Sequence, residues 1–188
     1  MARRKKCITR QSSSQPSAAG FAPSSLTAVC GVISSQESGV NLLSGSCMCG
    51  SVRYEACGKF RDIVGCHCTE CRKSSGHYSA ATSVRPDDIK FLNSAGLAWY
   101  RSSALAQRGF CRECGSTLFW KPDSGDRLSI FVGTVDGAID LPLSAHIYLA
   151  EKGSYYEITD DAEQHLTTGA DLSLANCRLK YGDSSEEI

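Results

Sequence analysis

Short stretches of alternating apolar and polar residues run through the middle of this chain. Val52, Tyr54 and Ala56 alternate with polar neighbours, and the same alternation is most regular over 128–132. A period of two is typical of a β-strand that buries one face. Further strands are predicted where runs are short and either apolar or rich in small residues, at 63–65, 79–84, 89–92, 117–120, 145–149 and 155–158.

Turn-forming residues separate these stretches at intervals of about ten residues. Pro122 to Gly125 predicts a hairpin turn, and Pro86 to Asp88 predicts a turn or a single helical turn. Residues 72–76 are basic and small, which favours a flexible loop. Little of the chain has helical periodicity. The pattern therefore predicts a mainly β fold with little helix.

The two ends of the chain differ from the middle. Residues 1–43 are rich in Ser, Ala and Gly and are basic at the start, and they contain one acidic residue, Glu37. This composition favours a disordered extension, or a targeting-like segment for organelle import. The remainder divides into a folded domain at 44–166 and a polar tail at 167–188, with a short helix expected at 170–176.

Composition narrows the functional classes. The 188 residues carry 20 basic and 20 acidic side chains, so charge provides no general attraction to nucleic acid or to an anionic membrane. There is no apolar run of about 18 residues that would predict a membrane span. The 11 cysteines are odd in number and closely spaced, which favours metal-bound thiolates in a reducing compartment over disulfides. We therefore expect a cytoplasmic protein, with organelle import as the alternative. Oligomeric state is not predicted.

Seven of the cysteines fall in three short segments. Cys-x-Cys and Cys-x-x-Cys segments hold zinc because thiolates are its preferred soft ligands. Seven thiolates complete one tetrahedron and leave three over. We assign four to a structural zinc, the four-cysteine group (Cys47, Cys49, Cys111 and Cys114), and three to a second zinc, the three-cysteine group (Cys66, Cys68 and Cys71).

A three-cysteine group leaves one coordination position open, as in zinc sites that carry out chemistry. A substrate thiol could occupy this position and be held as a thiolate. The alternatives are a second structural zinc closed by His67 or His77, or a group that binds no metal. His67 is expected to point away from the metal, and His146 is expected to be a core histidine with satisfied hydrogen bonds.

The cysteine motifs and their neighbours resemble a known family. Segments 45–55, 66–76 and 108–119, with Ser102, Ser103, Gly133, Thr134, Asp136, Pro142 and His146, match in order and spacing over residues 44–165. They resemble the glutathione-dependent formaldehyde-activating enzymes, a family that includes centromere protein V. Tyr155 and Tyr156 stand where many relatives have Trp, and the usual Pro after Asp161 is absent.

The resemblance implies a β-tent fold of small antiparallel sheets that is held together by zinc, with two zinc ions per chain in the two cysteine groups. It implies the condensation of formaldehyde with glutathione to an S-hydroxymethyl adduct, formally a carbon–sulfur lyase reaction. Arg72, Lys73 and Arg108 could bind glutathione carboxylates, and Ser102 and Ser103 could hydrogen-bond its peptide groups. The alternatives are a non-catalytic, zinc-stabilised binding module and a thiol or metal sensor.

Overall fold

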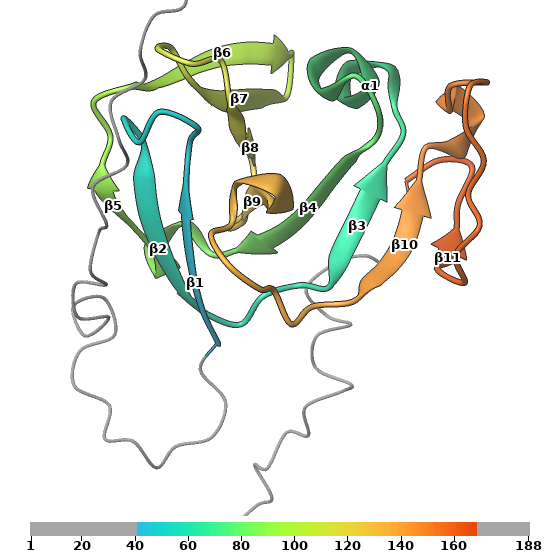
Figure 1. The fold of residues 1–188 in the computed structure, drawn as a ribbon. Coiled ribbons are helices and arrows are strands. Elements are labelled where there is room, and N and C mark those ends of the chain that lie inside the picture. The colour runs from blue at the N-terminus through green and yellow to red at the C-terminus, as the bar shows by residue number, and fades with distance from the viewer. Residues whose placement is uncertain (1–40, 169–188) are drawn as a thin grey trace, which may run out of the picture.

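The computed structural model describes residues 41–168, which form two β-sheets and one α-helix. The smaller sheet has the strand order β1-β2-β5, and the larger has the order β11-β10-β3-β4-β9-β8-β7-β6 (Figure 1). The mainly β prediction is confirmed. The strands are β1 (Asn41–Ser46), β2 (Arg53–Gly58), β3 (Ile63–Cys66), β4 (Ser79–Val84), β5 (Ile89–Asn93), β6 (Leu97–Ser103), β7 (Ala106–Cys111), β8 (Thr117–Pro122), β9 (Leu128–Phe131), β10 (Leu143–Ile147) and β11 (Glu163–Gln164).

Most neighbouring strands are antiparallel, as expected for strands joined by short turns. The exception is β10, which runs parallel to both β3 and β11. The pairing of β3 with β10 brings Cys66 opposite Ile147 and Gly65 opposite His146. No helix within residues 41–168 is both long and apolar enough to cross a membrane.

The two faces of the larger sheet have different uses. Its inner face packs against the smaller sheet, where the Tyr54 and Phe119 rings lie 5.1 Å apart, together with Val84 and Ile130. Its other face lines a cavity. Strand β9 is therefore buried along its whole length, and it ends at Phe131 because Val132 begins a 3-10 helix. The predicted alternation over 128–132 describes only the core side of this strand.

The loop predicted over 72–76 is wrong, because Thr69–Ser75 forms the α-helix α1. The Cys68 side chain caps its start by accepting a hydrogen bond from Cys71 N at 3.4 Å. Glu70 lies in the first turn, and Gly76 ends the helix by donating its N–H to Arg72 O. An acidic residue in the first turn, basic residues in the last turn and a glycine at the C-terminal cap all favour a helix. Seven residues are too few to show helical periodicity.

The strand predicted at 155–158 is also wrong. The side chains of consecutive tyrosines turn to one region, where Tyr155 donates to Gly76 O and Tyr156 contacts His67. Successive residues of a strand would point to opposite faces. Two other features were not anticipated, namely the β6–β7 hairpin and the start of β1 at Asn41, which places the predicted boundary at residue 44 inside a strand. The helix expected at 170–176 lies outside the described residues.

Candidate metal centres and cavity

The four-cysteine group joins two turns that are far apart in sequence. Cys47 and Cys49 follow β1, Cys111 ends β7, and the four sulfur atoms all lie within 4.8 Å of one another. Cys49 Sγ is 3.6 Å from Cys47 Sγ and 3.7 Å from Cys111 Sγ. A tetrahedron with Zn–S bonds of 2.3 Å has edges of about 3.8 Å. These separations therefore fit zinc, and they are far longer than a disulfide bond.

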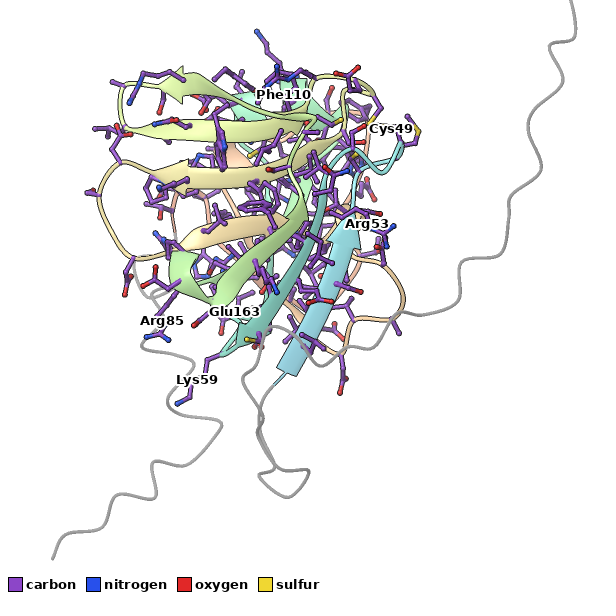
Figure 2. The ribbon with its side chains drawn as sticks, turned by 90° about the vertical axis from the view of Figure 1, so that its left-hand side faces the viewer. Cys49, Arg53, Lys59, Arg85, Phe110 and Glu163 are labelled. Carbon is purple, nitrogen blue, oxygen red and sulfur yellow. The ribbon has the colours of Figure 1, made fainter. Side chains whose placement is uncertain are left out.

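The two turns of this group have the same construction. Gly50 N–H donates to Cys47 O at 3.1 Å, and Gly115 N–H donates to Cys111 O at 2.8 Å. Both glycines have φ +77°, a conformation that strains other residues. Ser116 donates hydrogen bonds to Cys114, and these lower the pKa of that thiol to about 5. Figure 2 shows Cys49 at the edge of the molecule, where its side chain is exposed.

The three-cysteine group forms where β3 meets α1. Cys66 ends β3, Cys68 caps α1 and Cys71 lies in its first turn, with the three sulfur atoms within 4.8 Å of one another. Three thiolates are the ligand number of a zinc site with an open position. The residues present therefore fit zinc, and the structure brings together both cysteine groups that the sequence suggested.

A buried arginine borders the three-cysteine group. Arg108, on β7, is only 2% exposed, and its Nη2 donates to Cys71 Sγ at 3.4 Å and lies 3.7 Å from Glu70 Oε2. The pKa of the Cys71 thiol is far below its ordinary value, first because Cys66 and Cys68 donate hydrogen bonds to its sulfur and then because Arg108 does. The positive guanidinium thus favours negative charge on this sulfur.

A cavity of about 730 Å³ opens beside these sulfurs. Its floor is the outer face of the larger sheet, where alternate residues such as Ala81, Ser129 and Phe131 point to the same side. Among the five predicted substrate contacts, Ser103 and Arg108 line this cavity. The other three, Arg72, Lys73 and Ser102, do not: Lys73 is exposed, and Ser102 Oγ donates to Ala106 O at 3.5 Å.

Three of the other residues that line the cavity, Arg61, Arg127 and Tyr148, were not predicted as contacts. Arg61 and Arg127 belong to no motif, and their spacing along the sequence gives no sign that both line this cavity. Tyr148 is the one non-glycine residue with positive φ in the described chain, at 59°. Burial, and then the charges of Cys66 and Cys68, raise the pKa of its phenol above the ordinary value. The phenol therefore stays protonated and can donate a hydrogen bond at neutral pH.

A hydrogen-bonded array lies behind the three-cysteine group. His67 Nε2 is 2.8 Å from His146 Nδ1, and His146 Nε2 is 3.1 Å from Asp160 Oδ2. His67 Nδ1 is 2.5 Å from Tyr156 Oη. If Tyr156 donates to His67, His67 to His146 and His146 to Asp160, every contact has one donor and one acceptor. Both nitrogens of His67 are thus engaged away from the metal group, and His146 is a satisfied core residue.

Comparisons with known proteins find one matching family and several similar proteins. The family model described as "Glutathione-dependent formaldehyde-activating enzyme" matches residues 42–151. A Halomonas elongata protein, provisionally named as such an enzyme, is 26% identical over 152 residues, which cover 75% of this chain and 97% of that protein. An uncharacterised lyase of Schizosaccharomyces pombe is 25% identical over 118 residues, or 62% of this chain and 85% of that protein. A crystal structure of a Rhodobacter sphaeroides protein has a TM-score of 0.45 and 24% identity, and covers 54% of this chain and 99% of its own.

Proposed function

The chain belongs to the glutathione-dependent formaldehyde-activating enzyme family, and from that premise we propose that it is a zinc-dependent carbon–sulfur lyase. It would join a small aldehyde such as formaldehyde to glutathione or a similar thiol. One observation supports this most directly: three cysteine sulfurs within 4.8 Å of one another form part of the wall of a cavity of about 730 Å³. A closed structural site would have no need of such a space.

The reaction is an addition without oxidation or reduction. The thiol sulfur forms a bond to the aldehyde carbon, the carbonyl π bond breaks, and the thiol proton ends on the aldehyde oxygen, giving an S-hydroxymethyl thioether. Zinc held by Cys66, Cys68 and Cys71 would supply the charge that lowers the pKa of the incoming thiol. In the lyase direction the carbon–sulfur bond breaks, the carbonyl π bond forms again, and the hydroxyl proton returns to the sulfur.

Residues of the chain would bind and orient the two reactants. Three thiolates and Zn²⁺ carry a net charge of −1, and Arg108, beside Cys71, offsets this charge. Ser103 lines the same cavity and can hydrogen-bond a peptide group. Tyr148 also lines it, and its protonated phenol can donate to the oxygen on which negative charge develops.

The first test compares Cys71→Ser with the wild type. We expect the wild type to bind two zinc ions and to accelerate exchange between formaldehyde, glutathione and their adduct above the uncatalysed rate, as measured by NMR. Cys71→Ser should retain one zinc and lose the acceleration. Cys57→Ser is the matched control, because Cys57 lies outside both cysteine groups.

A second measurement examines the metal directly. In protein loaded with cobalt instead of zinc, glutathione should change the sulfur-to-cobalt absorption of the wild type and not that of Cys71→Ser. The proposal fails if glutathione leaves the spectrum unchanged and the wild type gives no acceleration. The binding-module alternative would then account for the two cysteine groups.

A further inference from the structure

Two of the arginines that line the cavity, Arg61 and Arg127, form no ion pair with Glu70 or Glu151, the carboxylates of the described chain that line it too. Burial, followed by the neighbouring charge of Arg127, lowers the pKa of Arg61 to about 10, although Asp62 acts in the opposite direction. Within residues 41–168, no ion pair includes Arg61 or Arg127. Arg61 Nη2 donates to Ala81 O at 3.0 Å, while its buried Nε has no partner in this part of the chain. Two half-buried positive charges that line one cavity favour an anion between them.

The sheet places these guanidinium groups at a defined distance from the cysteines. Cys66 pairs with Ser79, and Ala81 lies two residues further along β4. With a rise of about 3.3 Å per residue, the Arg61 guanidinium lies roughly 7 Å along the sheet from the level of Cys66. Arg127 directly precedes β9 and lines the same cavity as Ser129 and Phe131 of that strand, and Phe131 pairs with Ala81. Arg127 therefore extends the positive region further from the sulfurs.

We propose that Arg61 and Arg127 form a carboxylate subsite, which selects thiols that carry a carboxylate several bonds away from the sulfur. The inference rests on the proposed function, because it assumes that the thiol sulfur is held at the three-cysteine group. Guanidinium pairs with carboxylate through two parallel hydrogen bonds, which fixes the orientation of the ligand as well as its charge. A peptide thiol such as glutathione has this form, whereas a small neutral thiol leaves both arginines unmatched.

The subsite is tested by comparing glutathione with its diethyl ester, which has the same sulfur and no carboxylate. Calorimetry with metal-loaded, full-length protein should show that the wild type binds glutathione about 10- to 100-fold more tightly than the ester. Arg127→Met should remove most of this preference by weakening glutathione binding, while ester binding changes little. Arg127→Lys keeps the positive charge but loses the planar guanidinium group, so its preference for glutathione should lie between those of the wild type and Arg127→Met.

Arg85→Met is the matched control, because Arg85 is exposed, pairs with Asp88 at 2.9 Å and does not line the cavity. Figure 2 shows it at the opposite end of the molecule from Cys49. This variant should retain the full preference for glutathione. Melting temperature and zinc content, measured for each variant, identify any loss of affinity that comes from misfolding.

The outcomes separate the two proposals. If glutathione and the ester change the cobalt spectrum of the wild type equally and bind equally well, the thiol site stands and the carboxylate subsite is wrong. If the preference exists but survives in full in Arg127→Met, the proposed subsite is not its source and the inference is again overturned. If neither thiol changes the spectrum, the proposed function itself fails. The ester comparison uses only the wild type, so it does not depend on any variant folding.

Discussion

At the scale of single residues, Tyr148 combines backbone strain with a place in the cavity that the three-cysteine group borders. Its φ of 59° costs a residue with a side chain about 1–2 kcal/mol relative to glycine, and such strain is often found at functional sites. Its side chain lines the cavity, and its pKa responds to the charges of Cys66 and Cys68. A strained tyrosine here has a direct use if its hydroxyl group contacts the aldehyde.

We predict that Tyr148→Phe lowers kcat about 10-fold or more, because one preorganised donor is lost, while KM for the thiol changes little. Stability should remain within about 0.5 kcal/mol of the wild type. Steady-state kinetics and thermal melts would test this. Tyr148→Gly separates the two roles, since it relieves the strain yet should be equally impaired in kcat. Unchanged kcat in Tyr148→Phe would exclude the hydroxyl from the reaction.

The same scale shows what a sequence can reveal about a site. Metal ligands have to lie close together on tight turns, so Cys66, Cys68 and Cys71 stand out by spacing alone. Arg61 and Arg127 are 66 positions apart, and they line one cavity because the adjacent strands β3, β4 and β9 pair in one sheet. The positive charges of Arg72 and Lys73 suggested that these residues bind glutathione carboxylates. The helix α1 instead places them outside the cavity lining.

At the scale of elements, the parallel pairing of β3 with β10 depends on a close approach. A Cβ at Gly65 would lie 2.7 Å from His146 Nδ1, the atom that His67 Nε2 contacts. The glycine therefore makes room for the histidine array, which holds the segment between Cys66 and Cys68 from behind. The short helix and the tyrosine turn were not predicted at this scale, because side-chain contacts and not periodicity determine them.

We predict that Gly65→Ala destabilises the fold by about 1–3 kcal/mol, because the new methyl group displaces His146 and breaks its hydrogen bond to His67. Urea unfolding provides the measurement. Gly133→Ala is the matched control, since a Cβ there meets nothing within 4 Å and its φ is not positive. If the two substitutions cost the same, the close packing at Gly65 has no energetic importance.

At the scale of the whole molecule, the four-cysteine group connects the two sheets. It links the turn after β1, in the smaller sheet, to the turn after β7, in the larger one. The core between the sheets is built from short strands, so metal binding should contribute a large part of the folding free energy. The sequence predicted a mainly β fold with cysteine groups because the alternation of residues and the number of cysteines can be read locally. The order of the strands in the sheets depends on contacts between distant residues, so these local signals did not predict it.

We predict that Cys114→Ser lowers the melting temperature by about 10 °C or more and weakens zinc binding at the four-cysteine group, because a site that loses one of four ligands holds its metal less tightly. Cys57→Ser, at a half-buried cysteine outside both groups, should leave both quantities nearly unchanged. Differential scanning calorimetry with elemental analysis would show this. An unchanged melt in Cys114→Ser would mean that the core alone holds the sheets together.

The different uses of the two faces of the larger sheet have a consequence for how this protein could diversify. Along β4 and β9, residues 81, 129 and 131 border the cavity, while Val84, Leu128 and Ile130 belong to the core. Alternate residues of the same strands therefore serve different purposes, since one set shapes the proposed substrate cavity and the other set stabilises the fold. A library of variants restricted to the residues that border the cavity could therefore be screened for new thiols and aldehydes while the hydrophobic core stays unchanged.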